Sequence, residues 1–336
     1  MAFDSAPSAV HYDQVLTNLT LNWVTEQNFI ADKIFPVVNV SKKSDEFYKF
    51  DPAEANREVD STGLLLAPRT EPKKFDISHQ MDSYMAKVYG LAFDIDQQTM
   101  ANADAVLEIR QRKASQLMYK LLAARDRHFL AAFFGTGKWG QDIQGVASGA
   151  GANEFIQWDD SASTPIDDVR LWKRQFAIRN YGIKVNKMTI TQDILDALMA
   201  NTQILGRING GATIANPAMV DMTLLAQVFG VDEVVVADAV TNTAAVGAAE
   251  DAGYMLENQI LLTHTPMSAG LDTPASGLIF AWNALPNASF GITMESFTDD
   301  ALARQQIAEQ VHGKMSYDMR IVGPKLGTYV YDVLGG

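Results

Sequence analysis

Residues 109–139 read IRQRKASQLMYKLLAARDRHFLAAFFGTGKW, and this stretch decides the fold. No glycine or proline lies between Gly90 and Gly135. From Asp104, a candidate N-cap, apolar residues recur at three- and four-residue steps, the period of one helix face. The stripe consists of Val106, Ile109, Leu117, Leu121 and Ala124, and Lys113 interrupts it. A helix of about 31 residues would be about 45 Å long, so we expect it to cross a compact chain about 50 Å wide.

The end of this stretch, FFGTGKWG at residues 133–140, surrounds a lysine with glycines, as phosphate-binding loops do. Such a loop needs four residues between two glycines, then lysine and serine or threonine, between a strand and a helix. Here Trp139 follows Lys138, Ala132 takes the place of the first glycine, and a predicted helix precedes the stretch. We therefore predict a helix that stops at Gly135 and no nucleotide site.

On the N-terminal side, the first 50 residues place apolar side chains among polar ones, as in an arm with anchors. From Glu46 to about Ala92 the chain is polar and rich in turn residues. On the return side, stretches such as KFDISHQ and SYMAKVYGLAFDI alternate between apolar and polar residues. This pattern predicts a hairpin with legs of about 20 residues and a reach of about 60 Å. Since such a ribbon is marginal alone in water, we expect it to lie on another surface.

On the C-terminal side, residues 135–164 are rich in glycine, alanine and serine and predict a loop. Thr164 as N-cap, Pro165 and two aspartates predict the start of a helix that ends at Gly182. Beyond it, strands are predicted at 184–191, 233–240, 258–265, 277–285 and 290–297, helices at 192–201 and 218–230, and a final strand pair within 313–334. This alternation predicts a mixed α/β domain.

Composition narrows the function classes. Of the 336 residues 47% are hydrophobic, enough for a sizeable core in about two or three domains. Cysteine is absent, which removes disulfides and thiolate chemistry. A net charge of -13 opposes wrapping on nucleic acid. Without a signal peptide or an apolar run of about 18 residues, residence in a cytosol is expected.

No set of side chains suggests catalysis. The histidines stand singly at His11, His79, His128, His264 and His312. The paired aspartates at 159–160, 167–168 and 299–300 lie at predicted loops or helix starts, where capping explains them. Ser148 lacks the preceding glycine of a nucleophile elbow. We expect no catalytic residues, no metal and no cofactor.

The predicted elements follow one another as an arm, a long hairpin, a molecule-length helix, a mixed α/β domain and a returning strand pair. This order resembles that of the tailed-phage major capsid proteins of the Hong Kong 97 fold. Within that family, the chain looks like the branch that includes the lambda major capsid protein. The resemblance is carried by residues 48–63, YKFDPAEANREVDSTG, and by residues 109–139, 165–201 and 213–243. These motifs are patterns of size and hydrophobicity, and they cover most of the chain.

The resemblance implies an α+β fold divided into five parts. These are an N-terminal arm at 1–48, an extended β-hairpin loop at 49–93, a peripheral domain with the spine helix at 94–182, a mixed α/β axial domain at 183–310, and returning strands of the peripheral domain at 311–336. Some members cross-link a lysine of the extended loop to a neighbour. Lys73 and Lys74 lie in that region, but no acceptor pattern matches, so we do not expect this reaction.

The implied function is that of a major capsid protein, which self-assembles through hexamers and pentamers into an icosahedral shell around the double-stranded DNA of a tailed phage. The implied location is the virion, with assembly in the host cytoplasm. Partners would be many copies of the chain, with scaffold, portal and decoration proteins, weak non-specific contact with packaged DNA, and no membrane. The alternatives are an encapsulin-like nanocompartment shell of the same fold and an α/β enzyme.

Two groups of residues carry the expected contacts. The inter-subunit anchors would be Trp23, Phe29, Phe35, Leu64, Leu65 and Leu66, unless the apolar loop folds back on its own core. The candidate lumen-facing basic residues are Arg110, Arg112, Lys113 and Lys120 of the long helix. For this positive helix we favour a solvated face with salt bridges to neighbouring elements over a face turned toward packaged polyanion.

Overall fold

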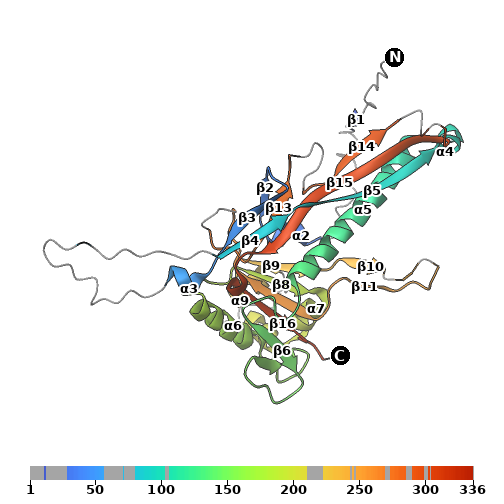
Figure 1. Ribbon diagram of the computed structural model, residues 1–336. Helices are drawn as coiled ribbons and strands as arrows, with labels where there is room; N and C mark the ends of the chain where they lie inside the picture. Colours follow the sequence, from blue (N-terminus) through green and yellow to red (C-terminus); the bar gives the residue numbers. More distant parts are fainter. Residues whose placement is uncertain are drawn as a thin grey trace.

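The computed structural model of the chain describes residues 11–12, 29–56, 71, 80–102, 106–209, 222–242, 244–245, 247–268, 273–284, 290–298, 302 and 304–335. Within these residues, the fold is a stack of layers in which one long helix lies between two sheets (Figure 1). The helix is α5 (Val106–Phe133), and its 28 residues confirm the predicted spine helix. At 1.5 Å per residue it is about 42 Å long. The expected N-cap, Asp104, lies outside the described residues.

The first sheet covers one side of α5. Its strands are β1 (His11–Tyr12), β2 (Val37–Val40), β5 (Lys87–Asp96), β13 (Gly277–Trp282), β14 (Thr293–Phe297) and β15 (Ile307–Ile321), in the order β1-β14-β15-β13-β2 with β5 paired to β15. α5 approaches β15 closely at Gly313, where a Cβ atom would lie 2.4 Å from the Leu117 side chain. A side chain at this position would therefore force Leu117 and Leu121 to move.

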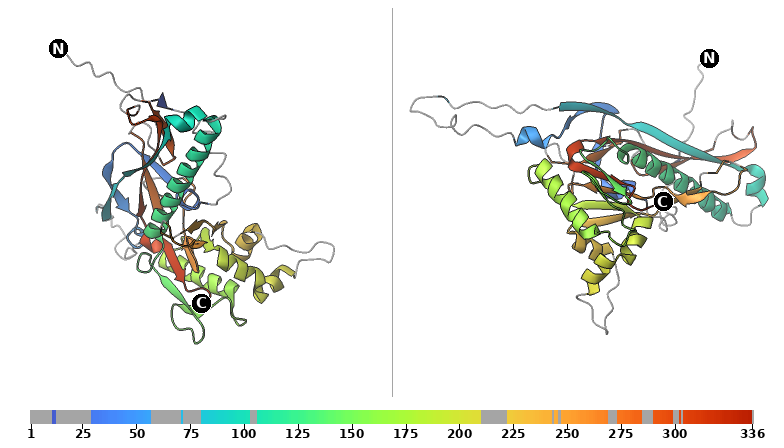
Figure 2. Two further views of the ribbon diagram at one scale, coloured as in Figure 1. Left: turned by 90° about the vertical axis from the view of Figure 1, so that its right-hand side faces the viewer. Right: turned by 90° about the horizontal axis from the view of Figure 1, so that it is seen from below.

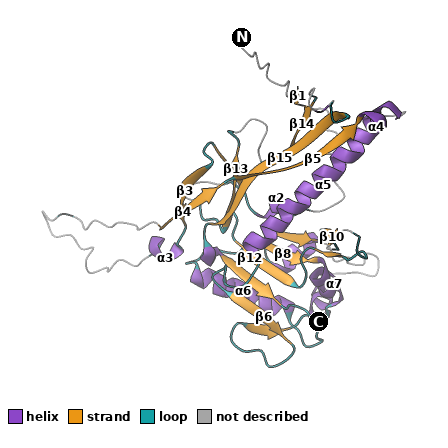
Figure 3. Cartoon of the chain, turned by 45° about the vertical axis from the view of Figure 1, so that its right-hand side comes forward, coloured by secondary structure: helices purple, strands orange, loops and turns teal. Residues whose placement is uncertain are grey.

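The second sheet lies on the other side of α5 (Figure 3). Its strands are β7 (Glu154–Ile156), β6 (Asp142–Val146), β16 (Gly327–Tyr331), β12 (Gln259–Thr263), β8 (Lys187–Thr191) and β9 (Glu233–Ala237), in that spatial order. Its far face is covered by the helices α6 (Pro165–Arg179), α7 (Gln192–Ala200) and α9 (Met222–Phe229), with α8 (Thr202–Asn209) beside them. Side-chain alternation divides each strand between two cores: Leu261 faces α5, whereas Ile260 and Leu262 face these helices.

A two-stranded hairpin forms the outermost layer beyond the first sheet. β3 (Ser44–Lys49) and β4 (Gln80–Met85) pair in antiparallel register from Ser44↔Met85 to Lys49↔Gln80. Phe47 and Tyr84 face inward and pack on Phe280, the Tyr84 ring being stacked at 4.4 Å. The predicted hairpin is thus confirmed over these strands, and it does lie on another surface. Figure 2 shows the hairpin, first sheet, α5 and second sheet in succession.

The smaller elements complete the chain. They are α2 (Ala31–Ile34), α3 (Pro52–Ala55), α4 (Gln97–Asn102), β10 (Val240–Asn242), β11 (Ala252–Tyr254) and the 3-10 turn η2 (Pro324–Leu326). The predicted helices at 165–182, 192–201 and 218–230 are confirmed as α6, α7 and α9, with shorter bounds.

Four details of the sequence prediction were wrong. The return leg of the hairpin ends at Met85, because Lys87–Asp96 form β5, which pairs with β15 in the first sheet. The glycine-rich segment 135–164 is not only loop, because β6 and β7 pair in parallel and bury Ile143 and Phe155. Thr164 makes no side-chain cap for α6; instead Gln203 of α8 accepts a 2.9 Å hydrogen bond from the N–H of Ile166. The closing strands do not pair with each other, since β15 joins the first sheet and β16 the second. The domain boundaries themselves stay a prediction.

Candidate assembly surfaces

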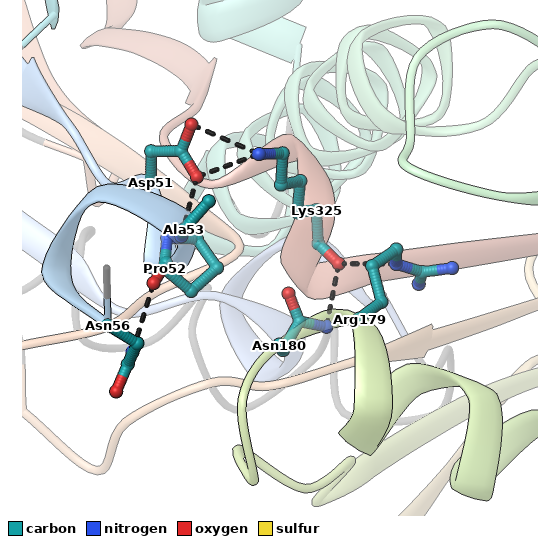
Figure 4. A network of polar contacts seen from close by, with 7 residues as sticks. All are labelled: Asp51, Pro52, Ala53, Asn56, Arg179, Asn180 and Lys325. Carbon is teal, nitrogen blue, oxygen red and sulfur yellow. Dashed lines mark hydrogen bonds and ion pairs between the residues drawn. The ribbon is translucent and has the colours of Figure 1, made fainter. Parts of the chain in front are cut away.

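The root of the hairpin is tied to the body of the chain by a polar network (Figure 4). The Asp51 carboxylate accepts bonds of 2.8 and 3.1 Å from Lys325 Nζ and one of 2.9 Å from the N–H of Ala53. The carbonyl of Lys325 accepts bonds from Asn180 Nδ2 at 2.9 Å and Arg179 Nε at 3.2 Å. η2 thereby joins the hairpin root to the end of α6. Partial burial acts to raise the pKa of Asp51, but Lys325 and Ala53 hold it below 3.8.

Apolar and backbone contacts reinforce this root. The N–H of Phe50 donates a 3.1 Å hydrogen bond to the carbonyl of Val322, and the Phe50 side chain packs against both the second-sheet core and the hairpin core. Lys49 Nζ lies 2.8 Å from Asp82 Oδ2 across the two strands. The direction in which the hairpin leaves the body is therefore fixed by contacts on several sides.

Sequence reasoning missed this network. Asp51 followed by Pro52 is a readable capping signal for a short helix. Its partner Lys325 lies 274 positions away, and no local pattern links the two residues.

Two of the expected anchors are buried in their own chain. Phe35 is 2% exposed, with its ring centroid 4.4 Å from that of Phe133. Phe29 is 6% exposed and packs beside Tyr119 of α5. Neither side chain has surface left for a neighbouring copy, so the expectation is corrected for both: they fasten the segment before β2 to the spine helix. Apolar residues in a polar stretch look alike whether they dock on their own chain or on another.

The other four expected anchors, Trp23, Leu64, Leu65 and Leu66, lie outside the described residues. Their role stays a prediction.

The four basic candidates on α5 divide into two pairs. Arg110 forms a 2.5 Å ion pair with Glu309 of β15, and Lys113 Nζ donates a 2.7 Å hydrogen bond to the carbonyl of Asp94. These two contacts agree with the favoured interpretation, in which the helix bonds to neighbouring elements. Arg112 and Lys120 are exposed. Arg127 is exposed as well, and the spacing of seven to eight residues places all three on one side of the helix.

The glycine-flanked lysine closes the C-terminus of α5. Lys138 Nζ donates to the carbonyls of Ala131 and Phe134, the latter at 2.7 Å. Trp139 Nε1 donates to the carbonyl of Phe133 at 2.6 Å. Gly135 has a φ of +139°, which a side chain would strain. These bonds satisfy carbonyls that a helix end leaves open, so the helix stop is confirmed and the lysine already has its partners. Burial lowers the pKa of Lys138.

The other chemical candidates have structural contacts where they are described. His128 Nδ1 lies 2.8 Å from Tyr317 Oη, and burial lowers the pKa of this histidine. Asp168 Oδ2 accepts a 3.1 Å hydrogen bond from Trp158 Nε1, and Asp159 accepts one from the N–H of Gly335. Asp299, Asp300 and His79 lie outside the described residues.

Among the described residues, no three carboxylate or imidazole side chains gather as metal ligands. None of the helices in the described ranges is long and apolar enough to cross a membrane.

The hairpin, the spine helix between two sheets and the helices over the second sheet define an α+β fold of the Hong Kong 97 type. This confirms the predicted resemblance at the level of the fold. A phage-related protein from Bordetella bronchiseptica is similar, with 17% identity and a TM-score of 0.68 over 97% of this chain and 98% of that chain. The capsid of cyanophage P-SCSP1u follows, with 15% identity and a TM-score of 0.55 over 91% and 88%. The mature capsid of bacteriophage PhiM1 has 12% identity and a TM-score of 0.54 over 90% of this chain and 87% of that chain. Comparison with family models and curated proteins gives no match.

Proposed function

We propose that this chain is a major capsid protein of a tailed phage, which self-assembles through hexamers and pentamers into an icosahedral shell around double-stranded DNA. The observation that carries the proposal is the likeness of fold over nearly the whole chain, from the segment before β2 to β16, to structures of phage capsids. No catalytic role is proposed. The location would be the virion, after assembly in the host cytoplasm.

The physical basis of assembly is contact energy spread over many interfaces. A standard interface buries about 1,600 Å², and apolar area contributes about 25 cal/mol per Å² before the cost of ordering is subtracted. Each subunit in a closed shell touches several neighbours at once, so modest contacts reinforce one another. A hairpin held at its root by Asp51 and Lys325 suits this task, because a fixed direction lowers the entropy lost on binding.

The anchors and basic residues predicted from the sequence would make the contacts of the shell. Trp23, Leu64, Leu65 and Leu66 would press on adjacent copies. Arg112 and Lys120 would face the packaged DNA and make weak, non-specific phosphate contacts. Scaffold, portal and decoration proteins would be the further partners.

Particle analysis tests the proposal. Purified protein is examined by analytical ultracentrifugation and electron microscopy, and particles are treated with nuclease before their contents are extracted. We expect closed megadalton shells or capsomers, and protected double-stranded DNA in particles from infected cells. Protein cargo in place of DNA would support a nanocompartment shell instead. A compact monomer or dimer under all assembly conditions would overturn both.

The anchoring role of the loop has its own test. Replacing Leu64, Leu65 and Leu66 together by serine removes apolar side chains that would otherwise be buried on a neighbour. We expect a soluble, folded subunit that assembles poorly. Normal closed particles from this variant would contradict the anchoring role.

A further inference from the structure

The helix α6 is apolar on two opposite sides. Its inward side contributes Trp172 and Phe176 to the second-sheet core. Its outward side carries Leu171, Ile178 and, just past the C-terminus, Tyr181, which are 51%, 70% and 53% exposed. A step of seven residues places Leu171 and Ile178 on one stripe of the helix, and Tyr181 follows in the turn after it, with a φ of +52°. A helix on a protein surface normally turns polar residues outward, so this outward stripe lacks a partner.

Only one charge interrupts the outward stripe. Arg174 lies between Leu171 and Ile178 at helical spacing and is exposed. It forms no ion pair with another residue that the structure describes. The neighbouring Arg170, by contrast, lies 2.8 Å from Asp167.

The outward face of the β3–β4 hairpin has the same composition with the opposite charge. Tyr48 and Met81 form a cross-strand pair at one end, and Met85 lies at the other; they are 47%, 57% and 49% exposed. Between these ends, Glu46 pairs with Ser83 in register and is exposed. Glu46 likewise has no ion pair within the described ranges.

The two surfaces are also similar in length. From Leu171 to Ile178, seven residues at 1.5 Å each span about 10 Å. From Ser44 to Tyr48, four residues at 3.3 Å each span about 13 Å. Each surface therefore presents apolar side chains at both ends and one charge between them, over a similar distance.

Within one chain, the outward stripe of α6 and the outward face of the hairpin belong to different layers of the fold. α6 packs on the far face of the second sheet, and the hairpin packs on the far face of the first sheet. At the hairpin root, η2 links Asp51 to the end of α6, but Arg174 and Glu46 are both exposed and form no ion pair with each other. Two different surfaces of one molecule that fit each other generate a head-to-tail contact, which closes into a ring when the rotation allows.

We propose that the outward stripe of α6 in one copy packs on the outward face of the β3–β4 hairpin in the next copy, with Arg174 paired to Glu46. This inference rests on the proposed shell function and names one of its contacts. The occupant of the stripe is a second copy of the chain, because the chain itself carries the complementary charge and apolar side chains.

Charge reversal tests the pairing. Arg174→Glu and Glu46→Arg each place like charges opposite one another, and the double variant restores the pair with its sign exchanged. We expect each single variant to weaken association about tenfold or more and the double variant to regain most of the loss. The matched controls are Arg207→Glu on α8 and Glu257→Arg, which make the same charge changes at exposed residues outside the two surfaces. Melting temperatures of unassembled subunits show that all variants fold.

Cross-linking supplies an independent readout, since the chain contains no cysteine. Ile178→Cys protein is mixed with Met81→Cys protein, assembled and oxidised. We expect covalent dimers in the mixture and fewer in either variant alone. Unaffected assembly of both charge-reversal variants, together with no cross-link in assembled shells, would overturn the contact and leave the proposed function standing. Loss of a second, co-purifying protein with intact shells would assign the stripe to that protein and also overturn it. A wild-type chain that never assembles would overturn both this contact and the proposed function.

Discussion

Asp126 of the spine helix holds the backbone of Ile30: its Oδ2 atom accepts a 2.8 Å hydrogen bond from the Ile30 N–H, and Oδ1 accepts one of 3.2 Å from Ala31. Ile30 is the N-cap residue of α2 and offers no side-chain acceptor. A carboxylate 96 positions away therefore satisfies N–H groups that a helix start leaves open. With Phe29 and Phe35 on either side, this contact fastens the segment before β2 to α5.

The Asp126 contact makes stability depend on pH. Burial raises the pKa of Asp126 from 3.8 to about 6, although the N–H of Ile30 and the charge of Arg125 act in the opposite direction. Between these two values the folded chain holds a proton that the unfolded chain has lost. The free energy of unfolding therefore falls as pH rises through this window and levels off above it. A shift of about two units corresponds to about 3 kcal/mol.

Asp126→Asn keeps an acceptor oxygen and removes the titration. We expect the free energy of unfolding of the wild type, relative to this variant, to fall by about 3 kcal/mol between about pH 4 and pH 7. Urea denaturation of unassembled subunits over this range measures the difference. Asp196→Asn, at an exposed site on α7, is the control. Parallel pH curves for wild type and Asp126→Asn would show that the group does not titrate in this way.

Lys138 gives a prediction that separates a helix cap from a nucleotide site. Lys138→Met removes the ammonium that bonds the carbonyls of Ala131 and Phe134. Since a cation at a helix C-terminus contributes about 0.3–1 kcal/mol, we expect the melting temperature to fall by about one degree. Adding ATP and magnesium should leave the melting temperature of the wild type unchanged. A nucleotide-dependent rise that the variant lacks would contradict the capping role.

The secondary structure was readable from sequence because its signals are local. The period of α5 and the strand-forming stretches KMTIT at 187–191 and EVVVA at 233–237 lie within single elements. β6 and β7 escaped detection because strands of five and three residues in a glycine-rich segment show too little alternation. β6 also pairs with β16, and residues Asp142 and Tyr329 of that register are far apart in the sequence.

The candidate surfaces were less readable for a physical reason. Apolar character marks a residue for burial without saying what buries it: Phe35 is covered by its own chain, whereas Ile178 is exposed. The outward stripe of α6 does follow a pattern, because Leu171 and Ile178 recur opposite to Trp172 and Phe176. The sequence does not show which side of α6 is covered. In the structure, the second sheet covers only the side of Trp172 and Phe176.

The ion pair between Asp51 and Lys325 is predicted to direct the hairpin rather than stabilise the fold. Both side chains are about one-third exposed or more, so the pair contributes about 0.5–1 kcal/mol. We expect Asp51→Asn to unfold at nearly the wild-type denaturant concentration, to be cut faster near residue 50 by a protease, and to assemble more slowly. The control is Asp45→Asn, which breaks the more exposed hairpin pair with Lys42 and leaves the root intact. Equal rates of proteolysis and of assembly for the two variants would contradict the prediction that this ion pair directs the hairpin.

The salt dependence of assembly follows from the charge of the whole chain. Each copy carries a net charge of -13, so copies repel one another as they approach. Raising the ionic strength from about 10 to about 150 mM shortens the screening length from about 30 to about 8 Å. Screening also weakens the single attraction between Arg174 and Glu46, but the repulsion involves the net charge of every copy. We expect light scattering to show faster assembly at the higher salt, and no such change when sucrose replaces the salt at equal osmolarity. Slower assembly at the higher salt would mean that attractive ion pairs between copies outweigh their net repulsion.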